Sequence, residues 1–413
     1  MNILIANWTW YPSGGDWTYI ESICKLYESQ GHKIIPFSVK NEKNIPNEFE
    51  QYFINGIDYK KYYDGMTVKS LLEIFSKSIY SFEAKKKLKL LLNEHRVDIA
   101  QFNNINNYQT PSIISVLKNN NIPIVWRILD YKLICPNNTF LQNDKVCEDC
   151  HKHKYYNCII NRCRKKSLPA SAFMALESYF YYLLPFYKHV DLFLFQSEFT
   201  RDMFVKYGYD IRKTHIVENP YNCSSIIAKN TGKDYILYFG RISKEKGIQT
   251  LLNAMKLLPG IELKIVGDGP EYEYYTKYIV ENSISNVTFL GPKWNKELEP
   301  IITDCEFVVI PSEWYEPSPY VALQSFSYGK PVIASNMGGL NDLITPNQNG
   351  MLFNVGDKES LSLTIKKLFY DKALISEMGI NARLLVENKY HPDRYYKDTI
   401  SVFANLINSK LKT

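Results

Sequence analysis

Two cations and a glycine lie where an apolar strand in the second half of the chain gives way to a helix. Residues 238–247 read YFGRISKEKG, so Gly240 ends the strand and Arg241 and Lys246 stand near the helix start. A glycine permits close backbone approach, a helix start offers free N–H groups, and paired cations stabilise the charge of a departing diphosphate. The segment indicates a diphosphate site, although a turn with two surface cations would show the same pattern.

Three further turns of the second half carry glycine or polar signals. Residues 265–270 (IVGDGP) form a strand end and a tight turn at Gly267, and residues 336–340 (NMGGL) form another flexible turn. Residues 311–320 (PSEWYEPSPY) run into a helix and place Glu316 just before it, with Gln324 eight residues further on. A carboxylate at this point can accept hydrogen bonds from sugar hydroxyls; a helix-capping charge is the alternative.

Parallel strands must place these turns, because ligands of open α/β sheets bind at the carboxyl ends of the strands. Apolar runs in the second half predict strands at 235–240, 262–266, 287–290, 307–311 and 331–334, and helices at 247–258, 271–282 and 320–328. The first half predicts strands at 3–6, 33–38, 98–102, 122–127 and 192–196, and helices at 17–30 and 112–118. Strands that alternate with helices indicate two parallel α/β sheets.

Length and a polar junction divide the chain into two domains. A chain of 413 residues suits two domains. The boundary is expected near residues 217–235, where Asn219 and Pro220 indicate a turn and residues 222–234 are polar and lack periodicity. We therefore predict one domain over residues 1–218 and another over residues 219–390.

Read in order, the turns of the second half resemble those of retaining family-4 glycosyltransferases, which have the GT-B fold. The resemblance covers about residues 219–390 and rests on G-R…K-G at 240–247, V-G-D-G-P at 266–270, P-S…E at 311–316, G-K-P-V-I-A-S at 329–335 and G-G at 338–339. In the first half, residues 8–16 (WTWYPSGGD) look like the family's glycine loop. Residues 127–136 (RILDYKLICP) look like a segment of bacterial capsular and surface-polysaccharide transferases.

The resemblance implies an α/β protein of GT-B fold, with two Rossmann-like domains that face each other across a cleft. The first domain would bind the saccharide acceptor, the second would bind a nucleoside-diphosphate sugar, and a helix over about 391–413 would pack back on the first. The implied catalytic residues are Arg241, Lys246 and Glu316. The implied donor-binding residues are Gly15, Gly240, Arg241, Lys246, Gly267, Pro292, Glu316, Ser318, Pro319, Tyr320 and Gln324. The acceptor-side candidates are Gly14, Asp16, Asn103, Arg127 and Asp130; for Asp16 and Asp130 a loop cap and a structural hydrogen bond are equal alternatives.

Three positions depart from the family pattern. Gln324 replaces a second Glu, and Leu129 and Asn103 stand where a His is common. Because Gln324 is a neutral amide and a deoxyribose has one hydroxyl fewer to satisfy, a dTDP-sugar such as dTDP-rhamnose is the predicted donor. A catalytically weak nucleotide-sugar-binding subunit of another transferase is the alternative function.

The family's retaining transfer is a front-face reaction in which the leaving phosphate takes the acceptor proton. The chain has no Asp-x-Asp metal motif. The resemblance therefore implies catalysis without a metal or other cofactor, with Arg241 and Lys246 replacing a divalent cation. The family's acceptors are often sugars linked to a lipid diphosphate.

Five of the eight cysteines fall between residues 135 and 166, a stretch that we name the cysteine segment. Cys147, Cys150, Cys158 and Cys163 have a spacing that suits four thiolates around one structural Zn²⁺. Reduced, partly buried thiols are the alternative, since cytoplasmic disulfides are rare.

Charge and aromatic content suggest a membrane surface as a partner. The net charge of +6 is small and no recognition motif accompanies it, so we expect no nucleic-acid partner. Residues 152–166 hold six Lys or Arg and no acid, and the aromatic stretch 171–187 follows. These stretches suit either lipid contact or, alternatively, a solvated loop and a buried helix. No leader pattern and no long apolar run is visible, so we expect a cytoplasmic protein, with lipid contact at the cytoplasmic face of the inner membrane.

Overall fold

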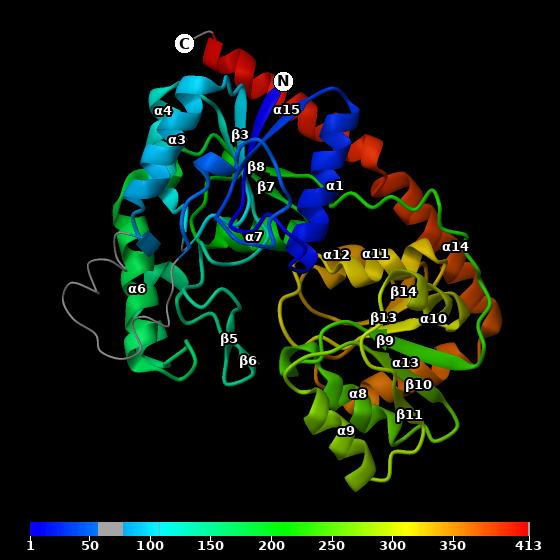
Figure 1. Cartoon of the computed structure of the whole chain (residues 1–413). Helices are drawn as coiled ribbons and strands as arrows, with labels where there is room; N and C mark the ends of the chain where they lie inside the picture. The colour runs from blue at the N-terminus through cyan, green and yellow to red at the C-terminus, as the bar shows by residue number, and fades with distance from the viewer. Residues whose placement is uncertain (57–76, 107, 412–413) are drawn as a thin grey trace.

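The computed structural model describes residues 1–56, 77–106 and 108–411. These residues form two α/β domains, each built on a six-stranded sheet, and every strand pair described in these sheets is parallel. The two sheets confirm the predicted fold class, and Figure 1 shows the domains one above the other.

The first sheet has the strand order β2-β1-β3-β4-β7-β8. Helices pack against both faces, so its central strands are almost entirely apolar and buried, as parallel strands usually are. The strands are β1 (Asn2–Ala6), β2 (Lys33–Phe37), β3 (Ile99–Phe102), β4 (Ile124–Arg127), β7 (Leu192–Phe195) and β8 (Thr214–Ile216).

Helices and a small hairpin complete the first domain. The helices are α1 (Gly15–Ser29), α3 (Phe82–Glu94), α4 (Ile114–Asn119), α5 (Tyr156–Ile160), α6 (Leu168–Leu183) and α7 (Glu198–Lys206). Short 3₁₀ turns are η1 (Glu50–Tyr52), η3 (Pro111–Ile113), η4 (His151–His153), η5 (Pro185–His189) and η6 (Ile211–Lys213). The cysteine segment contains the antiparallel hairpin β5 (Leu141–Gln142) and β6 (Lys145–Val146), followed by η4 and α5.

The second sheet has the order β11-β10-β9-β12-β13-β14, so strands are added on one side of β9 up to β11 and on its other side from β12 onward. At such a switch point the two following turns diverge to opposite faces of the sheet and leave a crevice for a ligand. The strands are β9 (Tyr235–Phe239), β10 (Glu262–Val266), β11 (Val287–Phe289), β12 (Val308–Ile310), β13 (Val332–Ser335) and β14 (Gly350–Phe353).

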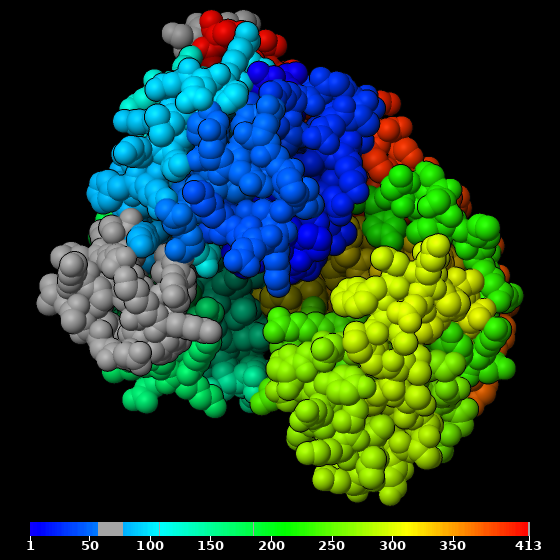
Figure 2. Space-filling model, in the orientation of Figure 1, coloured from blue at the N-terminus to red at the C-terminus, as the bar shows by residue number. Residues whose placement is uncertain are grey.

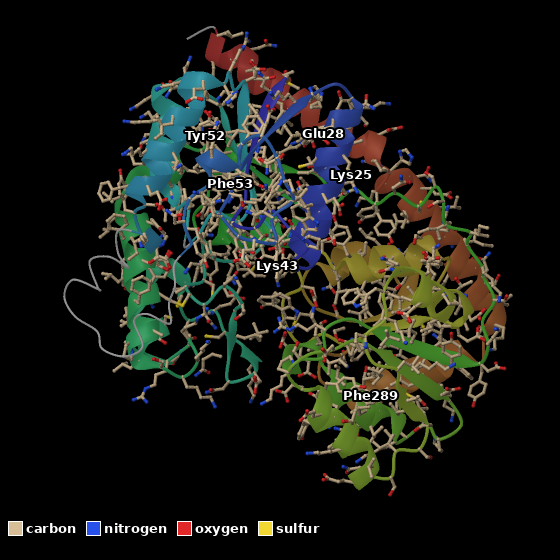
Figure 3. The ribbon with its side chains drawn as sticks, viewed as in Figure 1. Lys25, Glu28, Lys43, Tyr52, Phe53 and Phe289 are labelled. Atoms are coloured by element: carbon tan, nitrogen blue, oxygen red, sulfur yellow. The ribbon has the colours of Figure 1, made fainter. Side chains whose placement is uncertain are left out.

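The helices of the second domain lie on both faces of its sheet, and apolar clusters fill the space beneath them. They are α8 (Ile248–Met255), α9 (Tyr272–Glu281), α10 (Glu299–Asp304), α11 (Tyr320–Ser327), α12 (Leu340–Leu343), α13 (Lys358–Phe369) and α14 (Lys372–Lys389), with 3₁₀ turns η7 (Lys244–Lys246) and η8 (Asn295–Glu297). In Figure 3, Tyr52 and Phe53 mark the first domain and Phe289 the second.

The last helix, α15 (Pro392–Leu411), returns to the first domain (Figure 1). The hydroxyls of Tyr395 and Tyr19 are 2.7 Å apart, and the ring of Phe403 lies 6.1 Å from that of Tyr27. The chain thus crosses between the domains twice, once before β9 and once after α14. Residues 412–413 of the helix expected at 391–413 lie outside the described residues.

The aromatic stretch 171–187 is only partly a buried helix. Helix α6 buries Ser171, Ala175, Glu177 and Tyr181, whereas Leu176 is 56% and Leu183 is 75% exposed. The buried-helix interpretation is therefore wrong for the outer face of α6. Among the described residues, no helix combines the length and the apolar character needed to cross a bilayer.

Candidate active site

The turn after β9 brings two predicted donor residues next to the loop after β12. Gly240 ends the strand and donates its N–H to the carbonyl of Val266 at 3.0 Å. Gly247, at φ +68°, lies between η7 and α8, and a Cβ at this position would lie 1.8 Å from the carbonyl oxygen of Pro311. Only glycine lets these two turns approach so closely.

Lys246 and Glu316, both predicted catalytic residues, form an ion pair. The Lys246 ammonium lies 2.6 Å from Oε1 of Glu316, and the Ser312 hydroxyl donates to the same oxygen at 2.7 Å. The Glu316 side chain is 5% exposed and that of Lys246 is 24% exposed. Both contacts use Oε1, so neither engages Oε2. The ammonium also lies 5.3 Å from the centre of the Trp314 ring.

Arg241 stands at the other end of the same turn. Its side chain is exposed, and it forms no ion pair with the residues that the structure describes. A guanidinium without an acidic neighbour, close to Lys246, is available to an anionic ligand.

The glycine pair after β13 fixes the loop that carries Glu316. The N–H of Gly339 donates to the carbonyl of Glu316 at 2.7 Å, and a Cβ at Gly338 would lie 2.9 Å from the backbone nitrogen of Glu316. The remaining predicted donor residues of this region follow in the loop and in α11, where each is partly exposed: Ser318, Pro319, Tyr320 and Gln324.

Two further predicted donor residues, Gly267 and Pro292, lie at neighbouring strand ends. Gly267 follows β10 and donates its N–H to the carbonyl of Gly291 at 3.0 Å. Pro292 is exposed and follows β11, the strand beside β10. They therefore lie at the same edge of the sheet as the turn after β9.

On the first domain, Gly14 and Gly15 begin α1 and are exposed. The next residue, Asp16, accepts a hydrogen bond from the side chain of Asn104, which opposes the rise in its pKa that burial causes. Loss of hydration, together with the charge of Asp16, raises the pKa of Asp130 to about 6. The influence of Asp16 on Asp130 indicates that two acceptor-side candidates are neighbours.

Two other acceptor-side candidates are buried in structural contacts. Arg127 is fully buried; its guanidinium donates to the carbonyl of Val217 at 2.6 Å and to Oδ1 of Asn219 at 2.7 Å. Asn103 is 1% exposed and accepts a hydrogen bond from Gln101. The structure thus gives Arg127 a linking role at the domain junction, and it places neither residue where a saccharide could reach it.

An aromatic platform near Asp16 is absent from the sequence predictions. The rings of Trp8 and Tyr108 are stacked, with centres 5.8 Å apart and planes 5° apart. Trp8 follows β1, is 37% exposed and donates its backbone N–H to the carbonyl of Asn104. A half-exposed indole beside polar side chains suits the apolar face of a sugar ring. The tryptophans at 8 and 10 carried that signal in the sequence.

The thiols of the cysteine segment lie close together. Cys150 and Cys158 are buried in a small cluster with Tyr155 and Ala175, and all eight cysteines are free. Burial raises the pKa of Cys150 to about 12, which favours the neutral thiol. Within residues 1–56, 77–106 and 108–411, no three His, Cys, Asp or Glu side chains are arranged to hold a metal ion. Zinc at Cys147, Cys150, Cys158 and Cys163 stays a prediction, which metal analysis of fresh protein will test.

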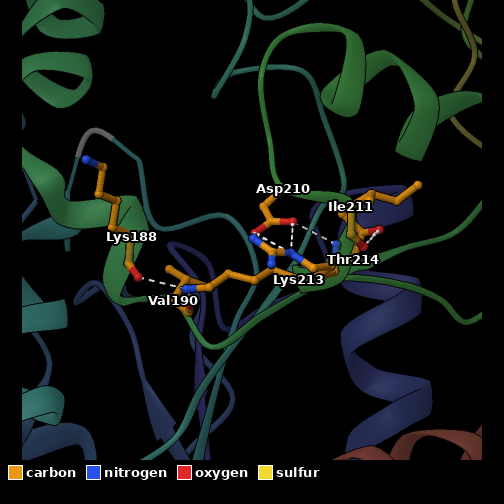
Figure 4. A network of polar contacts seen from close by, with 7 residues as sticks. Lys188, Val190, Asp210, Ile211, Lys213 and Thr214 are labelled. Carbon is orange, nitrogen blue, oxygen red and sulfur yellow. Dashed lines mark hydrogen bonds and ion pairs between the residues drawn. The ribbon is translucent and has the colours of Figure 1, made fainter.

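A cavity of about 490 Å³ lies in the first domain, apart from these donor residues. Seven of its 18 lining residues are Tyr or Phe, among them Tyr155, Tyr181, Tyr187 and Tyr207. At one end, Lys213 donates to the carbonyls of Lys188 and Val190, and Asp210 pairs with Arg212 (Figure 4). Since none of the predicted donor residues lines it, its size does not mark the donor site.

A second, polar cavity of about 290 Å³ lies between the domains. Its lining includes Ser197 of the first domain and Ser318, Gly339 and Asp342 of the second. Figure 2 shows the molecule hollowed where the two domains face each other. The loop that carries Glu316 therefore borders a polar interdomain space.

Comparison with known proteins agrees with this geometry. Residues 224–385 match the model of a family described as glycosyl transferases group 1. The lipopolysaccharide core biosynthesis glycosyltransferase LpsE of Rhizobium meliloti is 26% identical over 176 residues, 41% of this chain and 51% of LpsE. The chain spans about half the length of the curated relatives it matches.

Two solved structures cover the whole molecule. Sucrose-phosphate synthase from Thermosynechococcus elongatus has a TM-score of 0.73 at 17% identity, over 99% of this chain and 100% of that one. HepE of Anabaena in complex with UDP has a TM-score of 0.67 at 16% identity, over 98% and 100%. The chain therefore has the two-domain GT-B fold of glycosyltransferases, and its residues 224–385 carry the match to glycosyl transferases group 1.

Proposed function

We propose that this protein transfers a sugar from a nucleoside-diphosphate sugar to a saccharide acceptor, with retention of configuration, in the synthesis of a bacterial surface polysaccharide. The observation that carries the proposal is the contact between Lys246 and Glu316, in the same turn as Arg241, an exposed cation that forms no ion pair with any described residue. Cations for a diphosphate and a carboxylate for a sugar thus lie together where the second sheet reverses. The similarity to LpsE supports the surface-polysaccharide context.

In this proposal Arg241 and Lys246 bind the diphosphate and Glu316 binds the sugar. An ammonium has three N–H donors, so Lys246 can keep Glu316 while it donates to a phosphate oxygen. Oε2 of Glu316 then accepts from the sugar hydroxyls. Fixed donors aimed at the phosphate stabilise the transition state without reorganisation.

The reaction breaks the bond between the anomeric carbon and the phosphate oxygen, and the electron pair leaves with the nucleoside diphosphate. The acceptor hydroxyl attacks on the same face and forms the new glycosidic bond. Its proton passes to the leaving phosphate oxygen, so no side-chain base is needed at Leu129. The enzyme's contribution is then positioning and stabilisation of charge.

For the acceptor we propose a saccharide placed by Asp16, Asp130 and the Trp8 platform. The basic residues 152–166 and the exposed apolar face of α6 lie on the same domain. They suit an acceptor linked to a lipid diphosphate and presented at a membrane surface.

The test is turnover of Arg241→Ala and Lys246→Ala variants. Each should lower nucleotide-sugar transfer or hydrolysis at least about 100-fold, the loss expected when a preorganised charge donor is removed. Lys256→Ala is the matched control, because Lys256 is an exposed lysine of the same domain that contacts Asn282 instead. Rates near the control value in both variants would exclude the proposed site.

Calorimetric titration with UDP and dTDP separates the proposed donors. Gln324 motivates a dTDP-sugar, whereas a clear preference for UDP would exclude that donor. A chain that binds a nucleotide but neither transfers nor hydrolyses its sugar would instead be the binding subunit of another transferase.

A further inference from the structure

Tyr315 belongs to the second domain but has its side-chain contacts in the first. Its hydroxyl donates a hydrogen bond of 3.0 Å to Oε1 of Glu148. The centre of its ring lies 5.0 Å from that of Phe199 and 5.9 Å from that of Phe140. Glu148 and Phe140 come from the cysteine segment, and Phe199 comes from the first turn of α7. Two separate parts of the first domain therefore hold the residue that precedes Glu316.

Glu148 is itself held in place. Its Oε2 pairs with Lys206 of α7, and its backbone carbonyl accepts a hydrogen bond of 3.4 Å from the hydroxyl of Tyr207. The N–H of Cys147 donates to the carbonyl of Phe140 at 2.7 Å, so the hairpin ties the two Tyr315 contacts together. Glu148 is thus a hydrogen-bond acceptor that is already fixed in position, which lowers the entropy cost of binding the Tyr315 hydroxyl.

Two more hydrogen bonds cross between the domains beside this contact. The Ser197 hydroxyl donates to the carbonyl of Pro317 at 2.8 Å, and the N–H of Phe199 donates to Oδ2 of Asp342 at 2.7 Å. The first domain therefore holds the loop on both sides of Glu316, at residues 315 and 317. Glu316 itself contacts Lys246 and Ser312 of its own domain.

We propose that these contacts form an interdomain clasp that positions Glu316 when the domains come together, with Tyr315 as its positioning residue. This inference rests on the proposed function. It gives the cysteine segment a role, because the segment supports the loop that carries Glu316 from the opposite domain. Small displacements of a group that binds a reacting sugar are costly, about 100-fold for roughly 1 Å. Release of the clasp should therefore slow turnover without weakening nucleotide binding.

Three variants test the clasp. Tyr315→Phe keeps the ring but removes the hydroxyl, and Glu148→Gln removes the charge shared with Lys206. Each should lower kcat about 10- to 100-fold, as expected for a hydrogen bond to a charged group, and leave the affinity for UDP or dTDP within twofold. The double variant should be little worse than the less active single variant, because both changes act on the same contact: one removes the donor and the other removes the charge of the acceptor. Tyr370→Phe, at an exposed tyrosine after α13, should behave as the unaltered chain.

Hydrogen exchange gives a second readout that does not depend on catalysis. Backbone amides of residues 311–320 and 140–150 should exchange faster in Tyr315→Phe and Glu148→Gln than in Tyr370→Phe. Unchanged kcat in both variants, or a loss explained entirely by weaker nucleotide binding, would overturn the clasp, and so would unchanged exchange. A chain that is inactive before any substitution would refute the proposed function, whereas the exchange comparison would still decide the clasp.

Discussion

Glu316 shows how one residue can be both buried and available to a ligand. A carboxylate that is 5% exposed needs compensation, since an unpaired buried charge is costly. Lys246 and Ser312 supply it at a single oxygen. The other oxygen makes neither contact. In the proposed function, the pair stabilises the site before a donor arrives, and Oε2 is left for the sugar.

Asp130 makes stability depend on pH at the acceptor side. Its pKa is about 6 in the folded chain, against an ordinary value of 3.8, because burial disfavours its charge. The folded chain binds this proton more tightly than the unfolded chain does, so the contribution of Asp130 to the free energy of unfolding is fully present below about pH 4. It is lost as the pH rises to about 6.

Asp130→Asn should therefore raise the free energy of unfolding at pH 7.5, on the order of 1–3 kcal/mol, and change it little at pH 4. Denaturant unfolding at the two pH values measures this difference. Asp398→Asn, at an exposed aspartate of α15, is the control and should show no such pH dependence. Equal stability of Asp130→Asn and the unaltered chain at pH 7.5 would contradict the raised pKa.

At the scale of elements, glycine turns decide whether the donor residues meet. The turn after β9 and the loop after β12 come from strands that are neighbours in the sheet but more than 60 residues apart in sequence. Gly247 lets them touch at the carbonyl of Pro311. The contact between Lys246 and Glu316 depends on this close approach, because an added side chain would push the loop away.

Gly247→Ala should separate packing from backbone strain when it is compared with Gly356→Ala. The two glycines have φ values of +68° and +71°, but a Cβ at Gly356 meets nothing within 4 Å. Both changes should lower the melting temperature, by roughly 2–4 °C for the strain alone. Only Gly247→Ala should also weaken UDP or dTDP binding, at least about tenfold by calorimetry. Equal nucleotide affinity in the two variants would argue against the packed turn.

At the scale of the molecule, the first domain carries the features that suit a lipid surface. The outer face of α6 exposes Leu176 and Leu183, and Ile160 of α5 is 69% exposed. The six Lys and Arg residues of the stretch 152–166 lie just before α5 or between α5 and α6. In Figure 1, α6 stands at an outer edge of the first domain, away from the second.

Flotation with vesicles tests this surface. The protein should float with vesicles that contain phosphatidylglycerol but not with neutral phosphatidylcholine vesicles, and less at about 0.5 M salt, because the basic residues act over a Debye length. Leu176→Ser combined with Leu183→Ser should lower the bound fraction at least about threefold, since each buried leucine contributes roughly 1.5–3 kcal/mol. Leu363→Ser, at a leucine of α13 that is 68% exposed, is the control. Equal flotation of all forms would exclude α6 as the contact.

Strongly apolar segments could be predicted from the sequence, because burial on both faces of a parallel sheet requires them. The ten predicted strands are all present, within a residue or two of their expected bounds. The strands β8 and β14 were not predicted: they are short edge strands, and each includes partly exposed residues, so their apolar signal is weak. Glycine turns were also visible, since their spacing reflects close backbone contacts within one domain.

By itself, the sequence determined on which kind of sheet the predicted donor residues stand, and their binding of a diphosphate sugar stays a prediction. Only the tertiary structure decided that Lys246 pairs with Glu316, that Arg127 donates its hydrogen bonds at the domain junction and that Tyr315 contacts Glu148. The physical reason is range. Periodicity and turn chemistry act between residues a few positions apart, whereas these contacts join residues 70, 90 and 167 positions apart. The first two exist only once distant strands have formed a sheet, and the contact of Tyr315 with Glu148 exists only once the two domains have packed together.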